Sequence, residues 1–311
     1  MQKYRESRRC GIEGHKFIYD TLASKKQPIF IGKIGAIELQ VIYQTILIEQ
    51  KKITNYTPLI KYEAIHTAGM HPPNNATFAK FTNEFLHACK NIDILASWND
   101  NLLAIESMIW YDYVCKSSFV HKGLVDLQSL ESFYTESQYW WQNLYKNKTI
   151  LVISPFTNSI QKQLEYPQRN KVWSGKWNNF WDSSIKFKFI KFPHPYAISS
   201  DDEKAKYPAD INGVVEKYSN EIKNIGEFDI ALVGTGCFSI LLCSYIKASC
   251  NKNVIHLGGG LQMMFGVYGN RWFQDGNPSS FFKEYINEHW IRPLPEEIPQ
   301  HFKNQENGAY F

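Results

Sequence analysis

Long apolar runs are missing from this chain of 311 residues. The longest candidate runs from Phe238 to Ile246 and ends at Lys247, well short of the roughly 18 residues that a membrane-spanning helix needs. The basic stretch at residues 3–9 is followed by no apolar segment of the kind found in secretory signals. We therefore predict a cytoplasmic protein without a transmembrane segment. Peripheral contact between the basic stretch and a membrane surface stays open as an alternative.

Metal-binding cysteine patterns and a strong charge bias are missing as well. The six cysteines form no Cys-x-x-Cys pair and no Cys/His cluster at zinc spacing, which argues for reduced thiols and against a zinc site. The net charge is only +4, and no long stripe or tail concentrates Lys and Arg. A nucleic-acid partner is therefore not predicted.

Aromatic residues, in contrast, are abundant. They make up 15% of the chain, with 20 Phe, 18 Tyr and 9 Trp, in an otherwise globular composition of 44% hydrophobic and 21% charged residues. Flat amphipathic rings often line clefts and interfaces, where they stack on sugars, bases or partner surfaces. A cleft lined by some of these rings is one interpretation, and additional core packing is the other.

Apolar segments alternate with helical patterns along most of the chain. The segments that predict strands lie at residues 28–31, 93–96, 148–153, 187–191, 228–233 and 253–257. Helices of ten to fifteen residues between strands are typical of parallel sheets, so we predict an α/β, Rossmann-like fold with helices on both faces of a mainly parallel sheet. A composition shift divides the chain into residues 1–145 and 146–311, and one continuous domain is the alternative.

Several helices are predicted from the spacing of apolar residues. The regions are 36–50, 75–90, 100–114, 129–145, 200–225 and 278–289. Asn74 precedes the second of these and is a suitable N-cap. The tryptophans at positions 173, 177 and 181 are four residues apart, so they would share one face of a helix.

Five turns follow predicted strands and would gather at one edge of the sheet. They lie at residues 32–35, 97–99, 154–157, 234–236 and 258–260. Ligands of parallel sheets bind at this edge, and glycines followed by a helix start favour a phosphate-bearing ligand. None of the turns matches G-x-G-x-x-G or the Walker pattern. The alternative is that the glycines only allow tight packing of strand and helix.

Charged and histidine side chains near these turns are the candidates for chemistry. Lys33 is either a phosphate ligand or a solvated charge. Glu38, at the start of a helix, is either a functional carboxylate or a capping residue that interacts favourably with the helix dipole. His66, His71 and His194 lie in loops marked by proline or glycine, where they could act as general bases or contact phosphate.

Two segments resemble glycosyltransferases of the GT-D fold. Residues 30–39 read FIGKIGAIEL and resemble the R-F-G-D-G-E-[LF] signature that opens these enzymes. Residues 228–260 read FDIALVGTGCFSILLCSYIKASCNKNVIHLGGG and resemble their C-terminal strand, turn, helix and strand, which ends in an Asp-x-Gly turn. The resemblance implies transfer of a hexose from a nucleotide-diphosphate sugar, UDP- or GDP-linked, to a glycan or glycoconjugate acceptor in polysaccharide biosynthesis.

The resemblance also implies a donor site with an acidic D-x-E pair that holds a metal ion. Lys33 stands where the family has Arg, Gly35 matches its Gly, Ala36 replaces its Asp, and Glu38 matches its Glu. His256 stands at the Asp of the Asp-x-Gly turn. Since divalent cations prefer carboxylate oxygens, two alternatives follow, a Mn²⁺ or Mg²⁺ site at Glu38 or a metal-independent enzyme.

The predicted site combines the turns with the resemblance. Glu38 and His194 are the predicted catalytic residues, and Trp98, Trp173 and Trp177 are predicted to offer faces for stacking. The predicted donor-binding residues are Lys33, Gly35, Trp98, Ser154, Phe156, Gly234, Thr235, Gly236, Gly258 and Gly259. The alternatives to a transferase are a non-catalytic nucleotide- or glycan-binding protein on a degenerated transferase fold, and a phosphosugar or nucleotide hydrolase.

Overall fold

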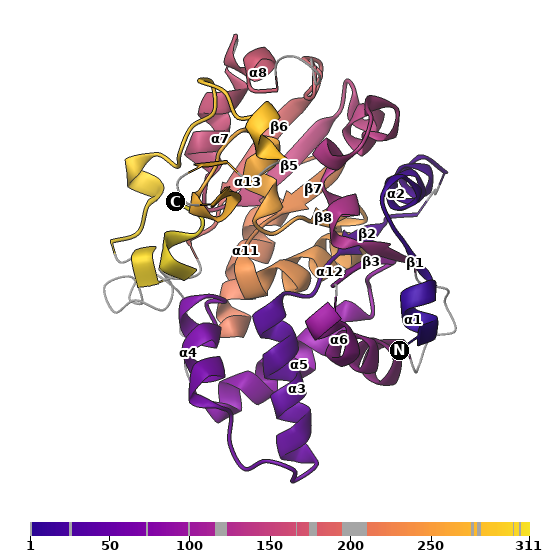
Figure 1. Cartoon of the computed structure of the whole chain (residues 1–311), viewed down its shortest axis with the longest axis vertical. Coiled ribbons are helices and arrows are strands. Elements are labelled where there is room, and N and C mark those ends of the chain that lie inside the picture. The colour runs from indigo at the N-terminus through magenta and orange to yellow at the C-terminus, as the bar shows by residue number, and fades with distance from the viewer. Residues whose placement is uncertain are drawn as a thin grey trace.

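A computed structural model describes most of the chain. It covers residues 2–24, 27–72, 74–98, 100–115, 123–165, 167–173, 179–194, 210–274, 277–278, 281–300, 302–304 and 306–311. Within these ranges the centre of the molecule is an eight-stranded sheet with the order β1-β4-β3-β2-β8-β7-β5-β6, in which every pair of neighbours is parallel (Figure 1). The strands are β1 (Arg8–Arg9), β2 (Phe30–Gly32), β3 (Ile94–Ser97), β4 (Gly123–Asp126), β5 (Thr149–Ser154), β6 (Lys186–Lys191), β7 (Ile230–Val233) and β8 (Asn253–His256).

Helices cover both faces of this sheet, so the predicted α/β, Rossmann-like fold is confirmed. One face packs against α3 (Ala36–Glu49), α4 (Pro58–His66), α5 (Asn75–Cys89), α6 (Leu103–Ile109), α11 (Ile211–Asn224) and α12 (Ser239–Cys250). The other packs against α2 (Ile12–Ser24), α7 (Thr157–Leu164), α13 (Gly260–Met264) and several aromatic segments. The shorter elements are α1 (Gln2–Glu6), α8 (Gln168–Lys171) and the hairpin strands β9 (Phe273–Gln274) and β10 (Asn277–Pro278).

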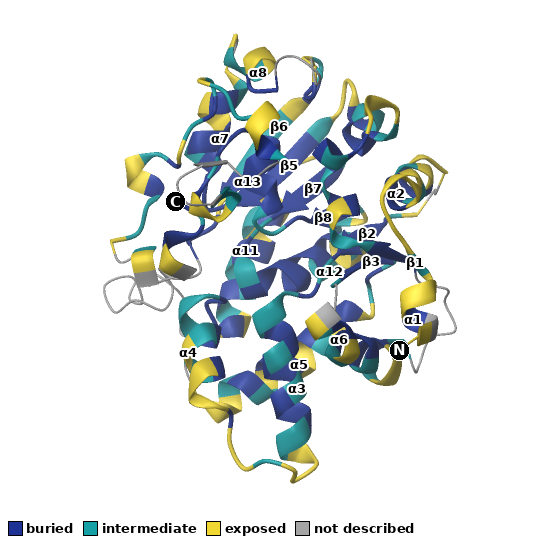
Figure 2. Cartoon of the chain, viewed as in Figure 1, coloured by how far each residue is buried: buried dark blue, intermediate teal, exposed yellow. Residues whose placement is uncertain are grey.

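The central strands are apolar on both sides because both faces are covered. In β5, Ile150 and Val152 join one hydrophobic cluster, while Leu151 and Ile153 join the other. All four side chains are fully buried. Figure 2 shows the same burial along the middle of the sheet. The central strands therefore appear in the sequence as short continuous apolar runs and not as an alternation of apolar and polar residues.

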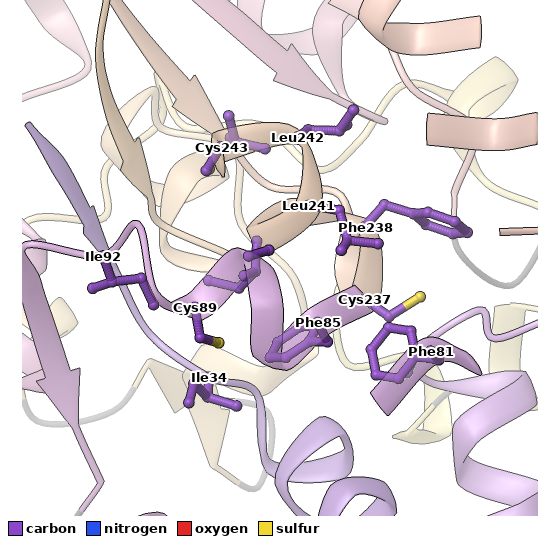
Figure 3. Close-up of a cluster of buried hydrophobic side chains, with 14 of the residues drawn as sticks. Ile34, Phe81, Phe85, Cys89, Ile92, Cys237, Phe238, Leu241, Leu242 and Cys243 are labelled. Carbon is purple, nitrogen blue, oxygen red and sulfur yellow. The ribbon is translucent and has the colours of Figure 1, made fainter. Parts of the chain in front are cut away.

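The helix pair α5 and α12 forms the packing next to the sheet on the first face. Phe81 and Phe85 of α5 lie in the same buried cluster as Leu241 of α12 and Cys237 just before it (Figure 3). Burial raises the pKa of the Cys237 thiol well above its usual value. All six cysteines of the chain are free, as the sequence predicts.

Strands from the two halves of the sequence meet at the centre of the sheet. β2 pairs with β8, with Phe30 opposite Val254 and Ile31 opposite Ile255. From β2 the chain moves outwards to β3 and β4, whereas β7 and β8 approach β2 from the other side. The carboxyl ends of β2, β8, β7 and β5 are consequently adjacent, where parallel sheets bind ligands.

Some helices form where the sequence predicts them from apolar spacing and capping residues. Asn74 is the N-cap of α5, since its side chain accepts a hydrogen bond from the Thr77 backbone N–H at 2.8 Å. The predicted helices at residues 36–50 and 75–90 correspond to α3 and α5. Among the described helices, none has the length and apolarity required to cross a bilayer.

The predicted helix at residues 129–145 is wrong. This segment forms successive 3₁₀ turns at Leu127–Leu130, Ser132–Tyr134, Ser137–Tyr139 and Trp141–Tyr145. Phe133, Trp140 and Trp141 are all buried against the sheet, where their rings pack on Trp173, Phe180 and Trp181 of a segment that is distant in sequence. Tertiary packing therefore overrides the helical spacing.

Two further helix predictions need correction. The described part of residues 278–289 contains one 3₁₀ turn, Phe282–Glu284, and no α-helix, and Pro278 belongs to β10. The indole N–H groups of Trp173 and Trp181 both donate to the carbonyl of Met264, at 3.0 and 2.8 Å, and both residues lie outside the described helices, with Trp173 two residues after the end of α8. Trp177 lies outside the described residues, as does the first part of the helix predicted at residues 200–225. The edge strand β1 and its neighbour β4 are short, carry no long apolar run and were not predicted.

The double-sided core gives a stability prediction. Leu232 of β7 is fully buried, so Leu232→Ala should reduce the free energy of unfolding by about 2–5 kcal/mol through lost contacts and a cavity. Leu59 of α4 is 63% exposed and serves as the matched control. Leu59→Ala should change the free energy by no more than about 0.5 kcal/mol in the same denaturant titration. Equal losses in both variants would contradict the assignment of β7 to the core.

Candidate functional site

A pocket with a volume of about 200 Å³ lies at the carboxyl ends of the central strands. It is lined by most of the residues predicted from the sequence, which come from all five turns. Those that line it are Lys33, Gly35, Glu38, Trp98, Ser154, Phe156, His194, Gly234, Gly236, Gly258 and Gly259. Residues far apart in sequence are therefore brought together by the parallel sheet.

Some predicted residues lie elsewhere. Thr235 is fully buried, and its backbone N–H and hydroxyl contact the Ser239 hydroxyl at 2.9 and 3.1 Å, so it stabilises the start of α12 and does not line the pocket. Trp173 is buried among aromatic rings, stacked on Phe133 and Phe180, and is unavailable for a sugar or base. His66 and His71 are not among the described residues that line the pocket.

The first wall of the pocket is the turn between β2 and α3. Gly35 is the N-cap of α3 and has no side chain to cap the helix. The carboxylate of Glu38 lies over Gly35, so a Cβ at position 35 would overlap it. Glu38 is 8% exposed and occupies the third position of the helix, the place of a capping-box glutamate. The capping role considered for Glu38 agrees with this geometry, and the same carboxylate borders the pocket.

Trp98 forms a second wall and is held from three directions. Its indole N–H donates to the Ile34 carbonyl at 2.6 Å, and its backbone N–H donates to the Glu106 carboxylate at 3.3 Å. Its backbone carbonyl accepts a hydrogen bond from Arg8 Nη1 at 2.8 Å. Because both ends of the residue are tethered, the indole has a defined position beside the β2 turn.

A buried polar network supports Trp98 from behind. The Glu106 carboxylate is fully buried and accepts hydrogen bonds from the hydroxyls of Ser97 and Tyr4, at 2.5 and 2.8 Å. Burial raises the pKa of Glu106, while these hydrogen bonds oppose the shift. The pKa of Tyr4 is raised by burial and by the nearby Glu106 charge. The network links α1, β3 and α6 at the base of the Trp98 wall.

The glycine turns after β7 and β8 form the floor. A Cβ at Gly234 would lie 2.8 Å from the Gly258 carbonyl oxygen, so the two turns approach each other through bare backbone. Gly236 and Gly258 both have φ of +58°, in the left-handed region that favours glycine. Lys33 crosses this floor, because its Cε lies 2.9 Å from where a Cβ of Gly258 would be.

Two histidines in the pocket are held neutral. Burial lowers the pKa of His194 to about 3, and burial together with the Lys33 charge lowers the pKa of His256 to about 3. His256 Nδ1 lies 2.9 Å from the Lys33 carbonyl oxygen, and since a carbonyl only accepts, Nδ1 carries the proton. His194 is packed against Phe156 and Phe311.

Buried polar atoms without partners among the described residues also line the pocket. They are His194 Nδ1 and Gln262 Oε1, although the Gln262 amide nitrogen donates to the Tyr310 carbonyl at 3.2 Å. A buried polar group without a partner costs about 1–3 kcal/mol. Ligand hydroxyls or N–H groups would satisfy both atoms, which points to a polyhydroxylated or amide-bearing ligand.

Several pocket residues were not predicted. They are Ala36, Ile37, Thr67, Ala68, Pro155, Gln262, Arg271 and Tyr310. Arg271 and Tyr310 come from segments without a strand, turn and helix pattern, so no local signal assigned them to this edge. The Arg271 guanidinium lies over the Tyr310 ring, 4.6 Å from its centroid, and both residues line the pocket.

The donor atoms of the pocket do not fit the metal ion that the resemblance implies. Mn²⁺ and Mg²⁺ require several oxygen ligands, commonly including carboxylates. Glu38 is the one carboxylate among the described lining residues, and Lys33 and Arg271 bring two cationic groups to the same pocket. In the described part of the chain, no group of three His, Cys, Asp or Glu side chains could hold a metal ion.

Comparison with known proteins assigns no family, since no family model, no curated protein and no solved structure matches the chain. The pocket must therefore be interpreted from its own geometry.

The buried imidazole of His194 predicts a specific acid sensitivity. Its pKa is about 3 in the folded chain and about 6.5 when unfolded, so the unfolded state binds more protons between these values and stability falls as pH decreases. In His194→Phe this contribution disappears. The stability of the variant relative to the wild type should rise by up to about 1.4 kcal/mol per pH unit below pH 6.5.

Urea titrations between about pH 6.5 and 4 measure this difference. His87→Phe, on the exposed side of α5, is the matched control for loss of an imidazole. A difference between His194→Phe and the wild type that does not change with pH would show that His194 is already solvated in the folded chain.

Proposed function

We propose that the chain is a glycosyltransferase that transfers a sugar from a nucleotide-diphosphate sugar to a hydroxyl of a glycan or glycoconjugate. The observation that supports this most is the single pocket that combines Lys33, bare glycine turns, the start of α3 and the Trp98 indole. A diphosphate binds well to cationic side chains and to the backbone N–H groups at the start of a helix, and glycine turns let it come close to the backbone. His194 Nδ1 and Gln262 Oε1, which have no partner in the described part of the chain, suit sugar hydroxyls, because a hydroxyl can both donate and accept.

In the proposed reaction, the bond between the anomeric carbon and the diphosphate oxygen breaks, and its electron pair leaves with the diphosphate. The acceptor oxygen forms the new bond to the anomeric carbon, and its proton passes to a base. Glu38 and His194 are the proposed candidates for that base, because both line the pocket. His194 is neutral at pH 7, so one of its ring nitrogens has a lone pair, and in the tautomer that leaves Nδ1 unprotonated this atom can accept the hydroxyl proton or a hydrogen bond from it.

The proposed donor is UDP- or GDP-linked, and the proposed setting is polysaccharide biosynthesis in the cytoplasm, with peripheral contact to a membrane surface as an option. These proposals rest on the resemblance of residues 30–39 and 228–260 to transferases of the GT-D fold.

A non-catalytic nucleotide- or glycan-binding protein is the second candidate. The position of Glu38 supports it, since this carboxylate lies over the N-cap of its own helix and could serve structure alone. Both candidates require the same pocket and differ only in turnover. Incubation with UDP- and GDP-sugars and a panel of glycan acceptors, followed by detection of released UDP or GDP, separates them. Donor binding without transfer to any acceptor would favour the binding protein.

Glu38→Gln tests the proposed base. If Glu38 accepts the proton, the variant should lose about 100-fold or more in kcat, because general-base catalysis contributes roughly this factor, while the KM for the donor changes little. Glu49→Gln, at the exposed opposite end of α3, is the matched control and should keep the wild-type kcat. Thermal unfolding of both variants separates a loss of capping from a loss of catalysis. Unchanged kinetics in Glu38→Gln would leave His194 as the remaining candidate, tested in the same assay by His194→Gln.

A further inference from the structure

Two cationic side chains border the same glycine turn of the pocket. Lys33 Nζ lies 3.2 Å from the position that a Cβ of Gly258 would take, and Arg271 Nη1 lies 3.4 Å from the corresponding position at Gly259. The two residues are more than two hundred positions apart in sequence, yet their charges act on each other, since burial lowers the pKa of Lys33 and the Arg271 charge adds to this shift. Neighbouring cations beside exposed backbone form a suitable site for an anion with two or more charges.

A carboxylate lies next to this pair. Glu131 follows the 3₁₀ turn after β4, and its side chain lies over Gly260, where a Cβ would overlap the carboxylate. The charges of Lys33 and Arg271 both act on it, while burial is strong enough to raise its pKa to about 7. Glu131 is therefore placed as a counter-ion to the pair, and not as a lining residue of the pocket.

Glu38 is the other carboxylate near Lys33, and its position differs. It lies over Gly35 at the start of α3, where the partial positive charge of the helix terminus favours a carboxylate. It can keep this position when an anion binds at Gly258 and Gly259. Glu131, in contrast, faces the same two cations that the anion would engage.

Resting on the proposed function, we propose that Lys33 and Arg271 clamp the diphosphate of the donor in place of a metal ion, with Glu131 as their counter-ion before the donor binds. Arg offers several N–H donors in a fixed planar arrangement that matches phosphate oxygens, and Lys adds a point charge. When the bond to the anomeric carbon breaks, the diphosphate gains one negative charge. The two cations stabilise that charge without any movement of the backbone.

The clamp predicts nucleotide binding that does not depend on divalent metal. UDP and GDP are the probes, and their Kd values should agree within about twofold in EDTA and in Mn²⁺ or Mg²⁺. Lys33→Gln and Arg271→Gln should each weaken binding of the nucleotide by about tenfold or more, because a charge-assisted hydrogen bond is lost. Lys52→Gln, at an exposed position after α3, is the matched control and should bind as the wild type does.

Arg271 is exposed, so Arg271→Gln keeps the test valid if Lys33→Gln does not fold. A gain of about tenfold or more in wild-type affinity on adding metal would overturn the clamp. Wild-type affinity in folded Lys33→Gln and Arg271→Gln would also overturn it. If these variants bind the nucleotide as the wild type does and also transfer sugar, the clamp is rejected but the proposed transferase function is still supported. Metal-free binding through the two cations without transfer would support the clamp and reject the transferase. No binding of either nucleotide would reject both.

Glu131 should make the affinity for UDP depend on pH, an effect that is not expected if the two cations have only a structural role. A bound diphosphate replaces the attraction between Glu131 and the cations with repulsion, so its pKa should rise further and a proton should be taken up on binding. Affinity for UDP should then decrease above about pH 7, by at most tenfold per pH unit. In Glu131→Gln this decrease should vanish while the titration of UDP itself remains. If the affinity for UDP depends on pH in the same way in Glu131→Gln and in the wild type, Glu131 is not the counter-ion of the two cations.

Discussion

The pairing of β2 with β8 is the interaction on which the rest of the molecule depends. It joins strands that are more than two hundred residues apart in sequence, with Ile31 opposite Ile255, into the middle of one sheet. Beyond the paired residues, the Lys33 carbonyl and His256 Nδ1 approach to 2.9 Å, so the contact continues from the strands into the turns. The strand pairing thereby sets the floor and one wall of the pocket.

The turns after β7 and β8 lie so close together that they decide which groups can line the pocket. Side chains are excluded where Gly234 meets the Gly258 carbonyl, so backbone groups remain at the surface of the floor. The side chains that enter come from the periphery, and they include the cations Lys33 and Arg271 and the acceptors Gln262 and His194. A pocket built in this way suits an anion at its floor and hydroxyl groups at its sides.

The charges in the pocket separate this chain from the metal-dependent pattern that it resembles. Ala36, at the position that the resemblance aligns with the signature Asp, offers no side-chain oxygen, and Lys33 brings a positive charge three residues earlier. A cation in the protein and a divalent cation in solution would repel each other at such short range. In the proposed clamp, one physical requirement, neutralisation of a diphosphate, explains why a pocket with few carboxylates carries both Lys33 and Arg271.

The sequence by itself determined the α/β class, α3, α5 with its Asn74 cap, and the turns at the carboxyl edge. These features depend on local spacing and on the rule that parallel strands end at one edge. Only the tertiary structure decided that residues 129–145 form 3₁₀ turns, that Trp173 belongs to the core, and that Arg271 and Tyr310 line the pocket. The reason is physical: contacts between residues distant in sequence control these positions, and no local pattern records them.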